Sequence, residues 1–198
     1  MTDSRIPGQD GSLPAASGET GLPDQNEQAR IRQEKLRDLQ SRGLDPFAEV
    51  TCQVTHRSRD ILEGFDTLEG RDVAVAGRLM SRRGMGKVSF CDLQDAAGRI
   101  QLFTRIDELG PDAYAEWQRL DIGDLVSVHG TVFRTNRGEI SIKTRSYVLL
   151  GKALRPLPEK FHGLRDTDTR YRQRYLDLIV NPEVRETFLR RSAILRSI

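Results

Sequence analysis

The sequence predicts a mainly β fold with flanking helices, in which five short strands form a small Greek-key barrel. Apolar and polar residues alternate with a period of two in five runs between Val73 and Leu150, which is typical of half-buried strands. Turn residues separate the runs, and a helical pattern lies between the third and fourth of them. The runs are VAVAGRLM, KVSFCDLQD, GRIQLF, DLVSVHGTVF and GEISIKT.

The helical pattern is the segment DELGPDAYAEWQRLD, in which Tyr114, Trp117 and Leu120 recur at helical spacing. It gives the order β-β-β-α-β-β, which is the order expected of an OB-fold, a five-stranded Greek-key barrel. Alternative small barrels lack the inserted helix. We therefore predict an OB-fold over residues 71–151.

The segments before the barrel have other patterns. Residues 1–25 are rich in Gly, Pro, Ser and Asp and lack hydrophobic periodicity, so we expect a disordered tail. Residues 26–70 form a helical and extended segment. Within it, NEQARIRQEKLRDLQSR predicts a surface helix that stops at Gly43, and SRDILEGFDTLEG predicts a short helix beginning at Ser58. The basic residues of the first helix fit a solvated face better than a nucleic-acid contact.

Composition restricts the function classes. The chain of 198 residues has 31 Lys and Arg against 29 Asp and Glu, so a polyanionic partner must meet a local basic patch. No window approaches the roughly 18 consecutive apolar residues of a membrane span, and the first residues have no signal-peptide pattern. We expect a cytoplasmic protein without a membrane partner. Cys52 and Cys91 are far apart and no His cluster accompanies them, so we expect free thiols and no metal site.

The alternation within each run separates a core side from an outer side. The residues expected to face the core are Val73, Val75, Leu79, Cys91, Leu93, Ile100, Leu102, Ile140 and Ile142. Phe90 shares the other side of its strand with Asp92 and Gln94, which is an unusual place for a large ring. The outward set of candidate binding residues is Arg78, Arg82, Phe90, Gln101 and Glu139.

An aromatic ring beside arginines and amide or carboxylate groups suits single-stranded nucleic acid. A base can stack on the ring, worth about 1 to 3 kcal/mol, and Gln or Glu can read its Watson–Crick edge. We expect Phe90 to stack, Gln101 and Glu139 to select the base, and the two arginines to contact phosphates. The alternative is that Phe90 packs under the loop 84–87 and that Glu139 pairs with an arginine. Because all five residues share one side, we favour the binding interpretation.

The segment KALRPLPEKFHGLRDTDTRYRQRYLDLI, residues 152–179, resembles the segment that joins the anticodon-binding and catalytic domains of bacterial lysyl-tRNA synthetases, which are of class II. The resemblance extends over VAVAGRLMSRRGMGKVSFCDLQDAAGRIQLF and TNRGEISI, and so covers the chain from about residue 26 onward. Aspartyl and asparaginyl relatives share the barrel but carry a different run here. The resemblance implies that the parent protein is a homodimer that activates lysine with ATP and Mg²⁺ and charges tRNA(Lys). This portion would then bind the anticodon loop, whose middle base is a uridine.

The residues 152–180 also permit a purely physical interpretation as an interdomain linker and docking helix. Between Lys160 and Arg174 there are five basic residues against two aspartates, which makes this segment a positive patch. This patch could lie along RNA, or its arginines could clamp a hinge between two domains through carboxylate pairs. We prefer the clamp, because an apolar stripe is expected to pack the helix against another element. The stripe comprises Tyr171, Tyr175, Leu178 and Ile179.

The chain from residue 181 onward predicts one further helix, with Asn181 as N-cap and Pro182 in the first turn. Its apolar residues Val184, Phe188, Leu195 and Ile198 recur at helical spacing. In the resembled family this is the start of motif 1, which builds the dimer interface, so we assign these four residues to that interface. The characteristic proline after the strand of motif 1 and the arginines of motifs 2 and 3 are absent. We therefore expect a synthetase cut inside motif 1, weakly associating or monomeric.

No catalytic residues, cofactor or metal site can be assigned within these 198 residues, and the loop Gly84–Gly86 is too short to cradle a phosphate alone. We expect the chain to make no lysyl-adenylate. Two functions remain open: the anticodon-binding portion of a lysine–tRNA ligase, and a stand-alone OB-fold protein that binds single-stranded nucleic acid or tRNA without catalysis. The gene sequence beyond Ile198 would separate them. A membrane-linked lysyl-transfer relative would need a transmembrane block.

Overall fold

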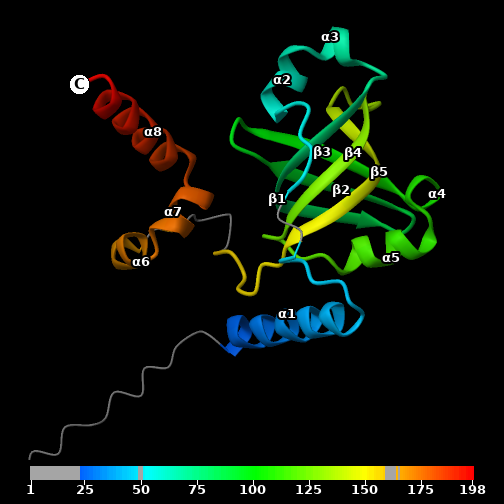
Figure 1. Cartoon of the computed structure of the whole chain (residues 1–198), viewed down its shortest axis with the longest axis horizontal. Helices are drawn as coiled ribbons and strands as arrows, with labels where there is room; N and C mark the ends of the chain where they lie inside the picture. The colour runs from blue at the N-terminus through cyan, green and yellow to red at the C-terminus, as the bar shows by residue number, and fades with distance from the viewer. Residues whose placement is uncertain (1–22, 49–50, 159–163, 165) are drawn as a thin grey trace, which may run out of the picture.

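Five strands form a closed barrel in the computed structural model, which describes residues 23–48, 51–158, 164 and 166–198. The barrel and the surrounding helices are shown in Figure 1. The predicted fold class, an OB-fold with flanking helices, is confirmed. The strands are β1 (Asp72–Met85), β2 (Val88–Gln94), β3 (Arg99–Arg105), β4 (Leu125–Arg134) and β5 (Ile140–Gly151).

The order of the strands around the barrel is β1-β2-β3-β5-β4. All pairings are antiparallel except that of β3 with β5, which runs in parallel from Gln101 opposite Ser141 to Phe103 opposite Lys143. The predicted helical segment between the third and fourth strands is present as two helices, because Gly110 at φ +87° interrupts it. These helices are α4 (Ile106–Leu109) and α5 (Pro111–Arg119).

The core fills the barrel and continues under α5, which lies beside one end of it (Figure 1). Trp117 of α5 is fully buried, and its Nε1 donates a hydrogen bond to Ser89 Oγ at 2.9 Å. The residues predicted to face the core are buried, with the exception of Ile140, which is only partly buried. Each fully buried aliphatic side chain contributes about 1.5 to 3 kcal/mol to the stability of the fold. The alternation of buried and outward residues along the strands therefore favours this barrel.

One irregularity changes which side chains of β1 face outward. The register between β1 and β2 shifts between Leu79 and Ser81, so Met80 is an extra residue, a β-bulge. Beyond the bulge, Arg82 lies opposite Cys91 and Arg83 lies opposite Phe90. The prediction that Arg82 shares the outer face with Phe90 is therefore wrong, because strict alternation does not count the bulged residue.

The remaining helices flank the barrel in Figure 1. The first begins before the predicted start at Asn26, so residues 23–25 of the predicted tail are helical, whereas residues 1–22 lie outside the described part of the chain. The helix predicted at Ser58 is divided at Gly64, and the predicted docking helix is divided at Gln173. No helix of the described residues is both long and apolar enough to cross a membrane. The helices are α1 (Pro23–Ser41), α2 (Ser58–Glu63), α3 (Phe65–Leu68), α6 (Thr167–Arg172), α7 (Arg174–Val180) and α8 (Pro182–Arg196).

Candidate nucleic-acid interface

Three phenylalanine rings lie together on the outer face of the barrel, and we call them the aromatic cluster. Phe90 of β2 lies opposite Phe103 of β3, and their ring centroids are 5.0 Å apart. Phe133 of β4 adds a third ring, 5.4 Å from that of Phe103. All three side chains are only half-buried, so part of each ring remains accessible. Phe90 was predicted from the sequence and the other two rings were not, although Phe103 has the same outward parity as Gln101.

Gln101 is held beside this cluster by its neighbours on both sides. It pairs with Asp92 of β2 and with Ser141 of β5. Ser141 Oγ donates a hydrogen bond to Gln101 Oε1 at 2.9 Å. Because the amide oxygen already accepts this bond, the Nε2 group is the part of Gln101 that can donate to a ligand.

Glu139 reaches the same place from the turn between β4 and β5. Gly138 adopts φ +86° in this turn, and the backbone N–H of Glu139 donates to Thr135 Oγ1 at 3.1 Å. The carbonyl oxygen of Glu139 accepts from Ser141 Oγ at 3.4 Å, so the one serine lies between Glu139 and Gln101. The Glu139 side chain is exposed and forms no ion pair with any described residue.

Two cationic side chains flank the aromatic cluster. Arg83 is exposed and lies opposite Phe90. Lys143 lies opposite Phe103, with its Nζ 5.8 Å from the centroid of the Phe133 ring and 3.7 Å from Glu108 Oε1. The outer face thus combines exposed aromatic surface, one free amide donor, the carboxylates of Glu139 and Asp92, and positive charge, which is a chemical set suited to nucleotides.

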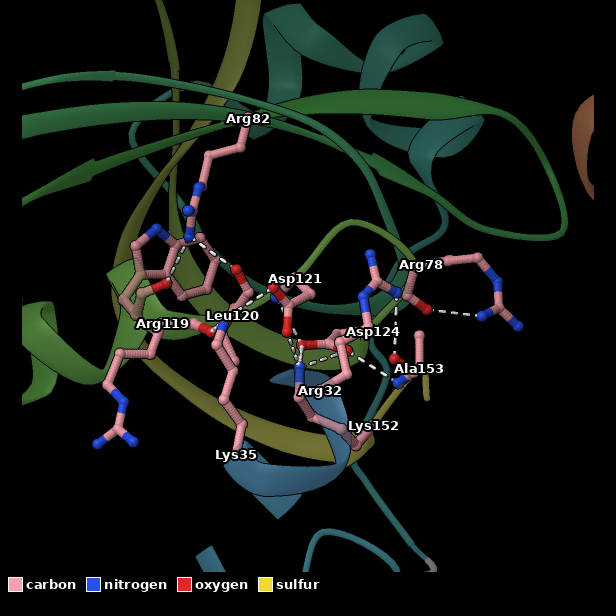
Figure 2. Close-up of polar contacts among 12 residues, drawn as sticks. Arg32, Lys35, Arg78, Arg82, Arg119, Leu120, Asp121, Asp124, Lys152 and Ala153 are labelled. Atoms are coloured by element: carbon pink, nitrogen blue, oxygen red, sulfur yellow. Dashed lines mark hydrogen bonds and ion pairs between the residues drawn. The ribbon is translucent and has the colours of Figure 1, made fainter. Parts of the chain in front are cut away.

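Arg82 and Arg78 have other partners. The Nη1 of Arg82 donates to the carbonyl oxygens of Gln118 at 2.5 Å and Leu120 at 2.7 Å, so this guanidinium caps the C-terminal end of α5 (Figure 2). Burial raises the pKa of the neighbouring Cys91 thiol to about 12, although the charge of Arg82 acts against this shift. The Nη1 of Arg78 donates to Gly123 O at 2.6 Å, and partial burial lowers the pKa of Arg78. These hydrogen bonds connect neither arginine to the aromatic cluster.

A buried group of charges fastens α1 to the barrel. Figure 2 shows Lys152 beside Asp121 and Asp124, with Nζ–Oδ2 distances of 2.5 and 2.8 Å. Lys35 of α1 forms a second ion pair with Asp121 at 2.7 Å. Burial alone would raise the pKa of Asp121, but the two lysines hold it below its usual value. Within the described residues, no group of three or more His, Cys, Asp or Glu side chains is placed to hold a metal ion.

One buried carboxylate holds two arginines of the segment that was predicted as a clamp. Arg170 and Arg174 both bind Asp177, which is fully buried, and Asn181 Nδ2 donates to it at 2.7 Å. Burial alone would raise the pKa of Asp177, but Asn181 and the arginines lower it. These pairs join α6, α7 and the start of α8 to one another, and do not join two domains. Lys160 and Arg165 lie outside the described residues.

The apolar stripe predicted for this segment is only partly covered. Tyr171 and Tyr175 are 73% and 55% exposed, so the prediction that they pack against another element is not met in this chain. Phe188 contacts the guanidinium of Arg174, and the last residue, Ile198, is 98% exposed. Nothing in the described part of the chain tests the assignment of four residues to a dimer interface, so it stays a prediction. The four residues are Val184, Phe188, Leu195 and Ile198.

The chain is similar in sequence to a family of nucleic-acid-binding domains and to several curated proteins. Residues 73–150 match the tRNA anti-codon family of OB-fold nucleic acid binding domains. The lysine–tRNA ligase of Moorella thermoacetica is 55% identical over 177 residues, which are 89% of this chain and 36% of the relative. Those of Pelotomaculum thermopropionicum and Clostridium perfringens are 52% and 51% identical over 88% and 87% of this chain, and in both cases over 34% of the relative.

The chain therefore spans about a third of the length of these curated relatives. The matched segment includes the whole barrel, and the predicted resemblance is confirmed over most of the chain. We conclude that the chain is similar to lysine–tRNA ligases over most of its own length, and that its barrel matches the tRNA anti-codon family of OB-fold domains.

Proposed function

We propose that this chain binds the anticodon loop of tRNA(Lys), as the anticodon-binding portion of a lysine–tRNA ligase. The observation that carries the proposal is the aromatic cluster with Gln101 beside it, on one outer face of a barrel that matches the tRNA anti-codon family. The names of the relatives support lysine as the amino acid.

Stacking supplies the part of the affinity that does not depend on sequence. Phe90 and Phe103 offer adjacent half-exposed rings, and a base stacked on such a ring contributes about 1 to 3 kcal/mol. Arg83 and Lys143 flank the rings, so the phosphates that accompany the stacked bases would meet positive charge. In this proposal Arg83 takes the phosphate role that the sequence analysis gave to Arg82.

Selection of the base rests on Gln101 and Glu139. The free Nε2 group of Gln101 can donate to O4 of uracil, whereas cytosine presents an amino group at the same position. The Glu139 carboxylate can accept from N3–H of uracil, and it would face a lone pair at N3 of cytosine. The two residues, on either side of Ser141, therefore favour uridine over cytidine. Uridine is the middle base that the family resemblance implies for the lysine anticodon.

For the parent protein we propose the ligase reaction, the use of ATP and Mg²⁺, a homodimer and a cytoplasmic location. The residues of this chain do not fit ATP and Mg²⁺, because motifs 2 and 3 are absent from its sequence and its described residues bring no metal-binding group together. We therefore expect no lysine-dependent exchange between ATP and pyrophosphate from this chain alone. Exchange above background would contradict that expectation.

The binding proposal is tested by titrating the chain with the anticodon stem-loop of tRNA(Lys). The matched comparison is a hairpin with the same stem and an unrelated loop sequence. We expect the lysine stem-loop to bind more tightly, and we expect Phe90→Ala to weaken both RNAs. Equal affinity for every loop would support the alternative of a stand-alone, sequence-tolerant binder. An absence of RNA binding would overturn both functions.

A further inference from the structure

The outer face that carries the aromatic cluster continues along β2 and β3 toward the turn between them. Buried residues alternate with half-buried ones through both strands without a register shift, and Arg99 at the start of β3 is exposed. Phe90 and Gln94 therefore lie on the same side of β2, as do Phe103 and Arg99 on β3. Four residues of strand span about 13 Å. The face thus leads from the rings to the turn over a distance that a few nucleotides can cover.

A pocket of about 490 Å³ opens at that end of the face, between the β2–β3 turn and the start of α8. Three arginines from three different elements line it: Arg59 of α2, Arg99 of β3 and Arg185 of α8. We call it the arginine pocket. Its lining includes one acidic residue, Glu186, which forms an ion pair with Arg190 at 2.5 Å. The pocket therefore has an excess of positive charge.

Two of these arginines retain unused donors. Arg99 donates through Nε to Gln94 Oε1 at 2.8 Å, and its two terminal nitrogens have no partner among the described residues. The side chain of Arg59 is exposed and has no hydrogen bond or ion pair with a described residue. Arg185 donates to the carbonyl oxygens of Asp95 and Ala96 and so forms the wall between α8 and the turn. Guanidinium groups gathered without carboxylate partners repel one another and favour an anion between them.

The walls of the pocket are held in place by Asp95. Its carboxylate accepts from the N–H and the Oγ of Ser58 at 2.6 and 2.7 Å, which ties α2 to the turn. It also accepts from the N–H groups of Ala97 and Gly98 at 2.7 and 2.8 Å. Two hydrogen bonds from α2 and two from within the turn thus occupy this carboxylate. Arg59 and Arg99 are thus carried on elements whose relative position is fixed before a ligand arrives.

We infer that the arginine pocket binds a backbone phosphate of the same RNA whose bases stack on the aromatic cluster. The inference rests on the proposed function and extends it beyond the base-reading face. Phosphate suits the pocket because planar guanidinium groups bind its oxygens in pairs. The RNA strand would run along β2 and β3 from Phe90 to Arg99. One wall of the site comes from α8, so the helices after the barrel take part in RNA binding.

The test compares Arg59→Gln and Arg99→Gln with Arg37→Gln. Arg37 is an exposed arginine of α1, which lies apart from α8 in Figure 1, so the control makes the same change of charge elsewhere. Affinity for the anticodon stem-loop of tRNA(Lys) is measured at several salt concentrations. One lost phosphate contact lowers the salt slope by about 0.7, which corresponds to about a fivefold loss of affinity at 0.1 M salt. We expect this loss for each pocket variant, and an unchanged preference among bases.

A variant that adds positive charge separates binding from damage to the fold. Glu186→Gln removes the one acidic side chain of the pocket and releases Arg190, so it should raise affinity. Thermal unfolding of each variant should match that of the wild-type chain. If Arg59→Gln and Arg99→Gln bind like Arg37→Gln while Phe90→Ala weakens binding, the inference is wrong and the proposed function stands. If the wild-type chain does not bind the stem-loop, the proposed function itself fails.

Discussion

Arg83 lies opposite Phe90 in the pairing of β1 with β2, and Arg82, one residue earlier, does not. The cause is the bulge at Met80, which inserts one residue and reverses the sides of the strand beyond it. Two adjacent arginines therefore have different surroundings. One stands beside the aromatic cluster, and the other donates hydrogen bonds to the C-terminal end of α5.

The first prediction follows from the position of Arg83. Arg83→Gln should lower affinity for the anticodon stem-loop about fivefold at 0.1 M salt and reduce the salt slope by about 0.7, because one phosphate contact is lost. Arg82→Gln should leave the slope unchanged. Titrations at three salt concentrations measure both. A reduced slope for Arg82→Gln, with none for Arg83→Gln, would show that the bulge does not govern the contact.

The second prediction concerns the stability that Arg82 provides. Its guanidinium donates to carbonyl oxygens at the end of α5, and hydrogen bonds from a charged donor are stronger than neutral ones. Arg82→Gln should lower the free energy of unfolding by about 1 to 2 kcal/mol. Urea unfolding measures this value. The control is Arg83→Gln, which should change stability by less than about 0.5 kcal/mol, because Arg83 is exposed and, unlike Arg82, donates no hydrogen bond to a described residue.

The third prediction concerns the buried charges between α1 and the barrel. Lys152→Met leaves Asp124, whose side chain is 0% exposed, without its cationic partner. Loss of one member of a buried pair should cost about 3 to 5 kcal/mol. Lys152→Met combined with Asp124→Asn should recover part of this loss, since the unpaired charge is gone. Lys87→Met, at an exposed lysine, is the control. Equal stability of the Lys152 and Lys87 variants would contradict the role of the network.

The fourth prediction concerns the pH dependence of stability. Burial would raise the pKa of Asp95, but its hydrogen bonds from Ser58, Ala97 and Gly98 outweigh burial and lower it below the ordinary value of 3.8. A lowered folded-state pKa gives stability that is complete above the ordinary value and is lost as the pH falls through the folded-state pKa. Asp95→Asn should therefore weaken the loss of stability on acidification.

Urea unfolding from pH 7 down to about pH 3 checks this expectation. Asp66→Asn, at an exposed aspartate of α3, is the matched control and should keep the wild-type pH dependence. If the Asp95 and Asp66 variants lose stability in parallel as the pH falls, the hydrogen bonds of Asp95 do not stabilise the charged carboxylate as described.

The barrel could be predicted from the sequence because the burial of one side of each strand requires apolar and polar residues to alternate. Val73, Val75 and Leu79 are inward by parity, and all three are buried. The same rule failed after Leu79, because Met80 is also buried and adds an unpaired residue. Two consecutive apolar residues inside a strand are the available sign of such a bulge.

The candidate site was predicted less completely, because it depends on contacts between distant strands. Phe103 could have been found by following the parity of Gln101 to the end of its strand. To predict Phe133, one would have to know the pairing of β4 with β5, which places its ring against Phe103. Lys152 looks like any surface lysine in the sequence. Its burial follows from the packing of α1 against the barrel, and no local pattern encodes that packing.

The central claim is that the outer face reads the middle base of the lysine anticodon, and one titration tests it most directly. Two stem-loops that differ only by uridine or cytidine at that base are bound to the wild-type chain and to the variants Phe90→Ala and Gln101→Ala. We expect the wild-type chain to prefer uridine by about 1 to 3 kcal/mol.

Gln101→Ala should lose most of this preference, and Glu139→Ala, added to the same series, should do likewise. Phe90→Ala should weaken both stem-loops equally, by about 1 to 3 kcal/mol, because stacking tolerates every base. An unchanged preference in Gln101→Ala, together with unfolding of the chain by Phe90→Ala, would contradict the account, since Phe90 would then belong to the core and the face would read no base.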